Sequence, residues 1–330
     1  MTNSGSERPG EFELIAELFA PLANAPGAFG LTDDAAIATP PSGHDLVVTA
    51  DSLVEGVHFF TTDPPELIAR KALRVNLSDL AAKGCAPSGY LVTLSLPSRI
   101  DARWLRAFAN GLAPDQTAFG ISLLGGDTTA TPGPLSIAIT AFGHVPQGKL
   151  LRRAGARPGD LVFVSGTLGD AGGGLACLKQ EACSSNAIDR AYLVDRFQVP
   201  QPRIALGQAL VGVASASIDV SDGLVADLGH IAESSSVHVG IEAARIPLSP
   251  ELKALWGTSQ GAILRAATAG DDYEIAFAVP PENCELVRRA AIGSGVSVTE
   301  IGRCEAGQGV ILVDEKEREI PVTRPGYVHF

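Results

Sequence analysis

Two aspartates, Asp219 and Asp222, lie three residues apart where a short apolar run gives way to a helical pattern. The run 216–220 contains β-branched residues and predicts a short strand, and the apolar spacing of 223–231 predicts an amphipathic helix. We therefore expect the two carboxylates at the end of the strand and the start of the helix. One interpretation is that Ser221 or Asp222 simply caps the helix by accepting hydrogen bonds from its first N–H groups.

Carboxylates stand beside apolar runs in several other parts of the chain, which favours a functional interpretation over capping. Carboxylates gathered from several segments repel one another unless a positive charge lies between them. Divalent cations that carry a polyphosphate provide that charge. The segments concerned are Asp33 and Asp34, the strand end at Asp51, 76–80 with Asp79, 125–129 with Asp127, and 270–274 with Asp271 and Asp272.

Each of these segments also has a purely structural interpretation, which stays open for the individual motif. The alternatives are a turn or cap at Asp33 and Asp34, a helix cap at Ser78 and Asp79, a plain turn at Gly125 and Gly126, a solvent-facing strand edge at 270–274, and a packed imidazole at His58.

The composition describes a globular α/β protein that is long enough for two domains. The chain has 330 residues, of which 45% are hydrophobic, with 36 glycines and a mean hydropathy of +0.19. Its net charge of −12 leaves no basic excess to neutralise nucleic-acid phosphates, so we expect no nucleic-acid partner. Anionic substrates remain compatible with this charge if metal ions or local arginines reverse its sign.

Cysteine usage and the lack of long apolar segments indicate a cytoplasmic protein. The five cysteines form no CxxC pair, which favours reduced thiols over a disulfide framework or a structural zinc site. Residues 1–10 are polar, with no apolar signal region, and no run of 18 apolar residues occurs, so we expect no membrane span. The cysteines are Cys85, Cys177, Cys183, Cys284 and Cys304.

Apolar periodicity predicts helices and strands along the whole chain. The predicted helices are 11–22, 66–73, 77–83, 102–112, 169–179, 223–231, 250–256 and 282–293. The predicted strands are 45–51, 90–96, 121–124, 135–142, 161–165, 216–220, 237–241, 275–279, 296–301 and 310–313. A stretch rich in Gly and Pro, 145–160, predicts a domain boundary, with an N-terminal domain of 1–147 and a C-terminal domain of 148–330.

The boundary stretch carries a basic cluster that stands out in so acidic a chain, namely Lys149, Arg152, Arg153 and Arg157. It is either a solvated linker or a group that binds phosphate. The chain contains neither GxGxxG nor GxxxxGK[ST], so any nucleotide is expected in a different architecture. The aromatic end of the chain predicts a tail that docks on the protein, through Tyr327, His329 and Phe330.

Taken together and in order, six motifs resemble those of the thiamine-monophosphate kinase family along nearly the whole chain. They are Asp33-Asp34-Ala35-Ala36, 51–59 from Asp51 to His58 and Phe59, 76–84, 125–129, 218–224 and 270–274. The resemblance implies the two-domain α/β (α+β) fold of aminoimidazole-ribonucleotide synthetase (PurM-like). In that fold an N-terminal mixed sheet with helices forms a barrel in the homodimer, and an α/β domain follows. It also implies direct, in-line, ATP-dependent phosphorylation of thiamine monophosphate to thiamine diphosphate with several Mg²⁺ ions.

The resemblance also implies roles for individual residues. The metal ligands would be Asp34, Thr49, Ala50, Asp51, Asp79, Asp127, Asp219 and Asp222, with Asp79 as a bridge between ions and Ala50 offering only its backbone carbonyl. Positions that hold ATP are matched by Gly126, Asp127, Arg153 and Ser221. The substrate side is matched by His58, Asp271 and Tyr327. An acceptor phosphate is already deprotonated near neutral pH, with a second pKa of about 6, so we expect no general base and no phospho-enzyme.

Three positions depart from the family pattern, and two other functions compete with this one. Thr32 stands where the family usually has Gly, Ala50 where it often has a hydroxyl residue, and Asp271 where Glu is common. The competing functions are another ATP-using synthetase of the same fold and a non-catalytic metal- or nucleotide-binding protein. Selenophosphate synthetase would need a reactive Cys or selenocysteine in its N-terminal segment, whereas the first cysteine here is Cys85.

Overall fold

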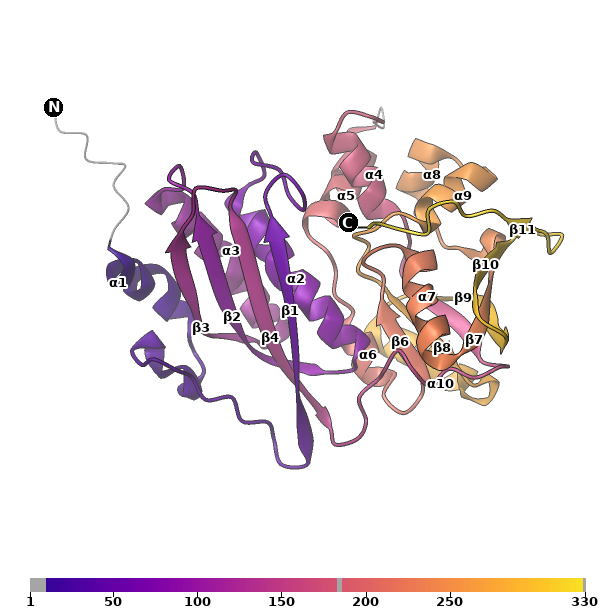
Figure 1. The fold of residues 1–330 in the computed structure, drawn as a ribbon, viewed down its shortest axis with the longest axis horizontal. Coiled ribbons are helices and arrows are strands. Elements are labelled where there is room, and N and C mark those ends of the chain that lie inside the picture. The colour runs from indigo at the N-terminus through magenta and orange to yellow at the C-terminus, as the bar shows by residue number, and fades with distance from the viewer. Residues whose placement is uncertain (1–9, 183–185, 329–330) are drawn as a thin grey trace. The chain divides into compact units, whose positions relative to one another are not determined.

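The computed structural model describes residues 10–182 and 186–328, which divide into two compact units. The first comprises Met1–Leu80 and Ala86–Gly148, and the second comprises Ala81–Cys85 and Lys149–Phe330 (Figure 1). Cys183, His329 and Phe330 lie outside the described ranges. No helix within those ranges combines the length and the apolar composition needed to cross a membrane.

The first unit is a four-stranded sheet with two long helices on one face (Figure 1). The strands lie in the order β1 (His44–Val54), β4 (Ser136–Pro146), β2 (Ala86–Leu96) and β3 (Ser122–Ala130). Only β2 and β3 are parallel. Helices α2 (Pro65–Ala82) and α3 (Ala102–Phe119) cover the sheet. Successive side chains of a strand point to opposite faces, and along β1 the half-buried positions carry Thr49 and Asp51.

A helical stretch precedes this sheet, as predicted for 11–22. It consists of α1 (Glu11–Leu14), a π-helical turn (Ile15–Phe19) and a 3₁₀ turn (Ala20–Leu22). A further 3₁₀ segment spans Pro26–Leu31.

Helix α2 corrects the prediction of two helices at 66–73 and 77–83, because it runs without a break. The polar residues between the two predicted helices are buried in the structure. Arg74 makes a bidentate ion pair with Asp115 of α3, at 2.7 and 2.8 Å, and the Asn76 amide donates to the Ala72 carbonyl at 3.0 Å. Asp79 therefore lies near the end of α2, and the capping interpretation of Ser78 and Asp79 is wrong.

Strand β3 corrects the prediction of a strand that stops at residue 124. It continues through Gly125 and Gly126 to Ala130 and pairs with β2, so the plain turn is also wrong. A Cβ at Gly126 would overlap the carbonyl oxygen of Val92 on the neighbouring strand. The glycine is therefore required by the close approach of two strands. Helix α3 is likewise longer than the predicted 102–112. It ends at Phe119 and is followed by the capping residue Gly120, whose φ is 64°.

The second unit is a seven-stranded mixed sheet with helices on both faces (Figure 1). Its strand order is β11-β10-β7-β9-β5-β8-β6. The strands are β5 (Leu161–Ser165), β6 (Ala216–Asp219), β7 (Val237–Glu242), β8 (Ile275–Val279), β9 (Val298–Ala306), β10 (Gly309–Val313) and β11 (Glu319–Ile320). The helices are α4 (Asp170–Leu178), α5 (Ala187–Gln198), α6 (Ile204–Ala209), α7 (Leu224–Ser235), α8 (Pro250–Trp256), α9 (Gln260–Ala267) and α10 (Cys284–Ser294). The bounds predicted for β5, β8 and α8 are confirmed.

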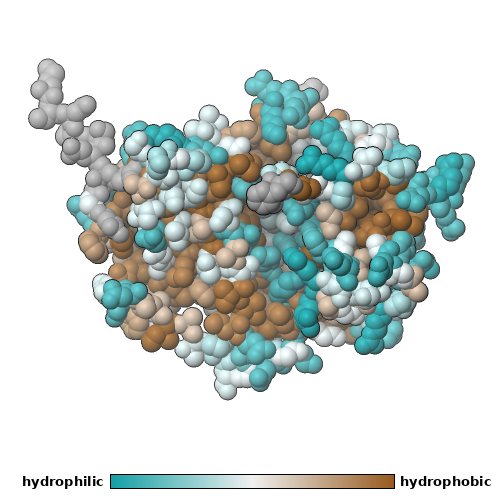
Figure 2. All heavy atoms as spheres, viewed as in Figure 1, coloured by the Kyte–Doolittle hydropathy of each residue, from teal (hydrophilic) through white to brown (hydrophobic). Residues whose placement is uncertain are grey.

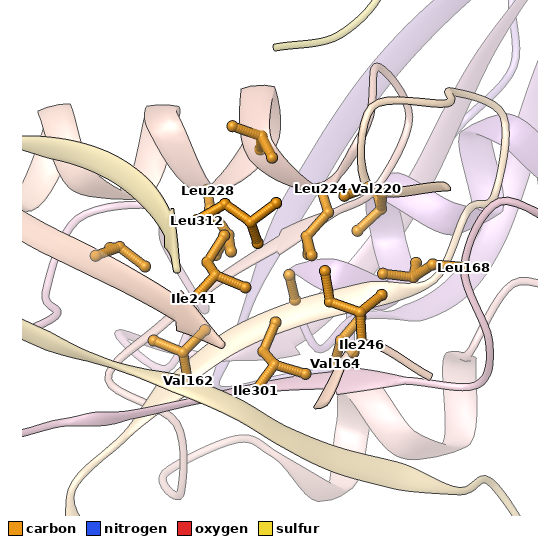
Figure 3. Packing of buried hydrophobic residues seen from close by; sticks show 14 of the residues in the cluster. Val162, Val164, Leu168, Val220, Leu224, Leu228, Ile241, Ile246, Ile301 and Leu312 are labelled. Carbon is orange, nitrogen blue, oxygen red and sulfur yellow. The ribbon is translucent and has the colours of Figure 1, made fainter. Parts of the chain in front are cut away.

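Two apolar cores lie on the two faces of this sheet because alternate residues of its central strands point to opposite sides. Val162 and Val164 of β5 join the core that contains Leu224 and Leu228 of α7 (Figure 3). Phe163, between them, joins the second core with residues of α6 and α10. The segments 161–164 of β5 and 275–279 of β8 are therefore apolar throughout. Helix α7 is fixed on the sheet directly after Asp219, the last residue of β6, and the loop that carries Asp222.

Candidate active site

The first group of candidate residues lies where β1 meets α2. The hydroxyl of Thr49 donates to Oδ2 of Asp79, and the Asn76 side-chain oxygen accepts from the N–H of Asp51 at 3.1 Å. Burial, together with the negative charge of Asp79, raises the pKa of Asp51 to about 6. No positive charge is described beside the carboxylates of Asp51 and Asp79. The side chains of Thr49, Asp51 and Asp79 offer only oxygen atoms, the ligands that Mg²⁺ prefers.

The other candidates in the first unit are not joined to this pair by any described contact. The N–H of Asp34 is bonded to the side chain of Asp33 at 2.8 Å, and exposed Asp127 accepts from the N–H of Thr128 at 2.8 Å. Ala50 is exposed on the opposite face of β1 from Thr49 and Asp51. Among the described residues, no group of three or more His, Cys, Asp or Glu side chains forms a metal site by itself.

His58 is held in the turn that follows β1. Its Nδ1 accepts from the N–H of Val54 at 3.0 Å, and its carbonyl accepts from Lys71 Nζ at 3.0 Å. The imidazole is half-buried. Because Nδ1 is an acceptor here, the neutral ring carries its proton on Nε2.

The second group of candidates comprises Asp219, the last residue of β6, and Ser221 and Asp222 in the loop between β6 and α7. The segment before β8 binds this loop through backbone hydrogen bonds. The N–H of Val220 donates to the carbonyl of Glu274, and the Val220 carbonyl accepts from Tyr273, both at 2.8 Å. The Ser221 carbonyl accepts from the N–H of Asp271 at 2.8 Å. Asp219 is 5% exposed.

Asp227, which sequence reasoning did not select, satisfies the N–H groups of the same loop. Its Oδ2 accepts from the N–H groups of Ser221, Asp222 and Gly223, at 3.0, 3.1 and 3.1 Å. Helix α7 has no side-chain cap, so the prediction that Ser221 or Asp222 caps it is wrong. Burial, with the charge of Asp222, raises the pKa of Asp227 to about 7. In the sequence, Asp227 looked like one more polar position on an amphipathic helix.

The C-terminal segment reaches the same loop, as the docking prediction requires, but through its backbone. The N–H of Tyr327 donates to the carbonyl of Asp222 at 2.9 Å. A Cβ at Gly326 would overlap that carbonyl, so glycine permits the close approach. The Tyr327 side chain remains 45% exposed. The predicted contacts of His329 and Phe330 lie outside the described residues.

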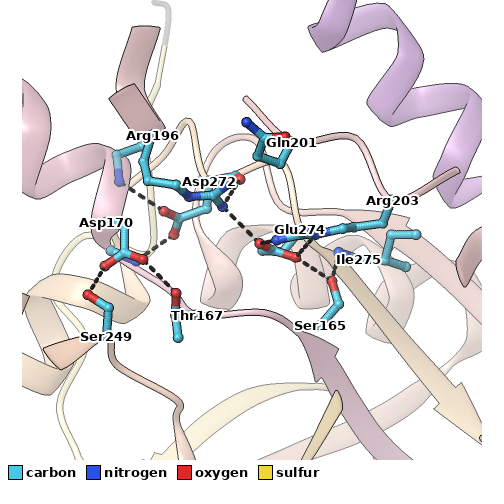
Figure 4. A network of polar contacts seen from close by, with 12 residues as sticks. Ser165, Thr167, Asp170, Arg196, Gln201, Arg203, Ser249, Asp272, Glu274 and Ile275 are labelled. Carbon is cyan, nitrogen blue, oxygen red and sulfur yellow. Dashed lines mark hydrogen bonds and ion pairs between the residues drawn. The ribbon is translucent and has the colours of Figure 1, made fainter. Parts of the chain in front are cut away.

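The segment 270–274 is anchored by a buried polar network (Figure 4). Asp272 accepts from the N–H groups of Gly169 and Ala171 at 2.6 and 3.2 Å. Glu274 accepts from Arg196 at 2.8 Å, from Arg203 Nε at 2.7 Å and from the Ser165 hydroxyl at 2.6 Å. Asp272 is 1% exposed and Glu274 is not exposed at all, so the solvent-facing edge is wrong.

Asp271 differs from its two anchored neighbours because it remains partly exposed. The backbone angle φ is 69° at Asp271 and 52° at Tyr273, values that residues other than glycine rarely adopt. The Tyr273 hydroxyl donates to Asp271 Oδ1 at 3.3 Å. Arg153, the candidate ATP clamp, is exposed, and its carbonyl accepts from the Ser235 hydroxyl at 3.1 Å.

Comparison with known proteins defines first a class and then a family. Residues 32–145 match the N-terminal domain of AIR synthase related proteins, and residues 157–315 match their C-terminal domain. The fold is therefore the PurM-like two-domain α/β fold of that class, as predicted.

Proteins that match almost the whole of this chain identify one family within the class. Thiamine-monophosphate kinase of Caulobacter vibrioides is 43% identical, over 97% of this chain and 91% of that protein. The crystal structure of thiamine-monophosphate kinase from Stenotrophomonas maltophilia matches with a TM-score of 0.79 and 42% identity, over 86% of this chain and 89% of that one. The structure of AaThiL complexed with AMPPCP and TMP matches with a TM-score of 0.78 and 31% identity, over 99% and 100% of the two chains. The chain belongs to the thiamine-monophosphate kinase family, which confirms the resemblance.

The raised pKa of Asp51 predicts a pH-dependent cost to stability in the absence of divalent cations. The folded protein holds this proton up to about pH 6, against 3.8 for the ordinary side chain, so stability falls as the pH rises through that interval. We expect Asp51→Asn to be more stable than wild type by about 1 to 3 kcal/mol near pH 7.5, with little difference near pH 4. Urea denaturation in EDTA measures this.

Asp314→Asn is the matched control for this prediction. Hydrogen bonds from the Arg318 side chain lower the pKa of Asp314 to about 2, so its ionised form is favoured by folding. This variant should be less stable than wild type near pH 7.5, which is the opposite sign. Equal stabilities of wild type and Asp51→Asn across the whole pH range would contradict the assignment of an uncompensated carboxylate pair.

Proposed function

We propose that this chain transfers the terminal phosphoryl group of ATP to the phosphate of thiamine monophosphate, giving thiamine diphosphate and ADP. The observation that carries the proposal is a set of aspartates at strand and helix ends, on backbone held by specific hydrogen bonds. They lie in a chain that matches a member of this family over 97% of its own residues and 91% of that protein. A relative of the same fold is complexed with AMPPCP and TMP, an ATP analogue and the expected acceptor.

The chemistry requires that two anions approach each other in line. Mg²⁺, when bound, cancels the repulsion between the phosphates of donor and acceptor. The residues of the chain fix the carboxylates that hold the ions and bind the two substrates in position. The acceptor phosphate is its own nucleophile near neutral pH, so we assign no general base and no covalent intermediate.

Individual roles follow the family pattern. As metal ligands we propose Asp34, Thr49, the carbonyl of Ala50, Asp51, Asp79, Asp127, Asp219 and Asp222. For ATP we propose Gly126, Asp127, Arg153 and Ser221, and for thiamine monophosphate His58, Asp271 and Tyr327. The N–H of Ser221 is already bonded to Asp227, so only its hydroxyl is available to ATP. We assign dimerisation and the larger share of metal and ATP binding to the domain 1–147. The second domain, 148–330, adds Arg153, Asp219, Ser221 and Asp222. We place the enzyme in the cytoplasm, consistent with the free thiols of Cys85, Cys284 and Cys304 in the described part of the chain.

The function is tested by ADP release from Mg-ATP in the presence of thiamine monophosphate or free thiamine. We expect stimulation by the monophosphate alone, with thiamine diphosphate as product. Asp79→Asn and Asp219→Asn should each lower turnover by at least about 100-fold while leaving the fold intact, because each removes a charge that holds the metal. ATP binding without stimulation by thiamine monophosphate would instead favour a different acceptor substrate in an enzyme of the same fold. Near-normal turnover of both variants would contradict the assignment of Asp79 and Asp219 as metal ligands.

Arg153 is tested against Arg157, an exposed arginine in the same basic cluster. An arginine that clamps a phosphate of ATP contributes a charge-assisted hydrogen bond. We expect Arg153→Ala to raise the apparent KM for ATP by about 10-fold, the equivalent of roughly 1.4 kcal/mol, with a smaller effect on kcat. Arg157→Ala should leave KM unchanged. If the two variants change the apparent KM for ATP equally, Arg153 does not bind ATP and is part of a solvated linker.

We further propose that the chain forms a homodimer through the sheet face of the first unit that α2 and α3 leave uncovered. Leu46 and Val48 of β1 are 40% and 54% exposed on this face. Hydrophobic residues gather over the sheet in the view of Figure 2. Exposed apolar area of this kind is typical of an interface between protein chains.

Light scattering tests this interface. The chain has a mass of 34.1 kDa, and we expect wild type at twice that value. Val48→Lys should shift the protein toward the monomer because it places a charge in the apolar face. Ile292→Lys, at a position that is 83% exposed on α10, serves as the control and should remain dimeric. A dimeric Val48→Lys protein would locate the interface elsewhere.

A further inference from the structure

The loop from Val220 to Asp222 has a partner for each of its backbone polar groups. Glu274 and Tyr273 bind the N–H and carbonyl of Val220, and Asp271 and Tyr327 bind the carbonyls of Ser221 and Asp222. The two remaining N–H groups donate to the carboxylate of Asp227. Every partner except Asp227 uses its backbone for this purpose. Asp227 is therefore the one side chain among the described contacts that fixes these peptides.

The position of Asp227 is one that an anion would otherwise fill. Successive N–H groups that converge at the start of a helix form a concave site that attracts phosphates and carboxylates. Here the N–H groups of Ser221, Asp222 and Gly223 all donate to a single oxygen of Asp227, and its side chain is almost fully buried. The chain thus fills this position with its own side-chain oxygen, which leaves the same N–H groups unavailable to a phosphate.

We infer that Asp227 is a positioning residue for metal binding, which orients the peptides that carry Asp219 and Asp222 and keeps phosphate away from the loop amides. This inference rests on the proposed function, since it assumes that the two aspartates hold Mg²⁺. With its N–H groups bonded to Asp227 and its carbonyls bonded to neighbouring N–H groups, the loop backbone is fixed, and the side chains of Asp219 and Asp222 project from it as the proposed ligands. Without Asp227, three N–H groups lose their acceptor. The loop is then held through its other backbone contacts alone, so the carboxylates of Asp219 and Asp222 are less firmly oriented relative to each other.

The experiment compares Asp227→Ala and Asp227→Asn with Asp160→Asn. Asp160 is also a buried carboxylate of the second unit, 5% exposed, and it accepts from the N–H of Arg157 at 2.9 Å and the Ser215 hydroxyl at 2.6 Å. It supports a loop with none of the proposed metal ligands. Mg²⁺ binding is measured by calorimetry with a non-hydrolysable ATP analogue present, below the unfolding temperature of each variant.

Residues that orient metal ligands typically change metal affinity by about 10- to 100-fold when they are removed. We therefore expect Asp227→Ala to weaken Mg²⁺ binding by about 10-fold or more, and to raise the Mg²⁺ concentration for half-maximal turnover more than the KM for thiamine monophosphate. Asp227→Asn keeps an oxygen acceptor at the same distance and should retain part of the affinity. Asp160→Asn should lose stability without losing Mg²⁺ affinity.

Two outcomes would overturn the inference. One is wild-type Mg²⁺ affinity in Asp227→Ala with reduced stability, which would limit Asp227 to supporting the helix. The other is an equal loss of affinity in Asp160→Asn, which would reflect general destabilisation. If Asp227→Ala does not fold, the comparison of Asp227→Asn with Asp160→Asn decides. A wild type that binds Mg²⁺ but shows no turnover with thiamine monophosphate would refute the proposed function and leave this comparison intact.

Discussion

A carboxylate that is fully removed from water must be neutralised, and Glu274 meets this requirement with two arginines. Arg196 and Arg203 both pair with it, and the hydroxyl of Ser165 donates to it as well. Breaking such a buried arrangement by removing one partner is strongly destabilising, commonly by about 3 to 5 kcal/mol. The start of β8 is therefore fixed within the second unit, and this also fixes the residues that directly precede it in the chain.

The unusual backbone of 271–273 follows from this anchor. A residue other than glycine with positive φ costs about 1 to 3 kcal/mol and persists only where its surroundings determine the conformation. Asp272, between the two strained residues, is bound by the N–H groups of Gly169 and Ala171, and Glu274 is bound by the arginines. The strained segment then presents N–H groups to the carbonyls of Val220 and Ser221. The order of the acidic loop is thus a consequence of ion pairs buried next to it.

Local patterns were sufficient wherever neighbouring residues decide the structure. The apolar runs of β5 and β8 and the apolar spacing within 250–256 predicted β5, β8 and α8 at their observed bounds. Prediction failed where the deciding partner is distant in sequence. Residues 74–76 lie between two predicted helices, and the partner that buries Arg74 within one helix, Asp115, lies 41 residues away. The predicted strand 121–124 ends too early because the contact of Gly126 with Val92 joins two strands that are distant in sequence.

The same limit applies to the candidate site. The aspartates could be selected from the sequence because motif order and spacing are local properties that a family resemblance preserves. The role of Asp227 could not, since it depends on how the loop folds back over the first turn of α7. The partners of Glu274 were equally hidden, because α5 and α6, which carry or adjoin Arg196 and Arg203, showed no clear pattern in the sequence.

Asp51 and Asp227 show how one kind of perturbation supports two different roles. Burial and a neighbouring carboxylate raise the pKa of both. At Asp227 three N–H groups converge on one oxygen and partly offset this cost, so the group is committed to the loop. At Asp51 the bond to Asn76 involves the backbone N–H, and only burial and Asp79 act on the carboxylate. A cation at Asp51 would therefore relieve a charge that the fold has left uncompensated, whereas at Asp227 it would have to displace the bonds that hold the loop. Similar shifts in pKa thus distinguish a metal ligand from its support only when the hydrogen-bond partners are known.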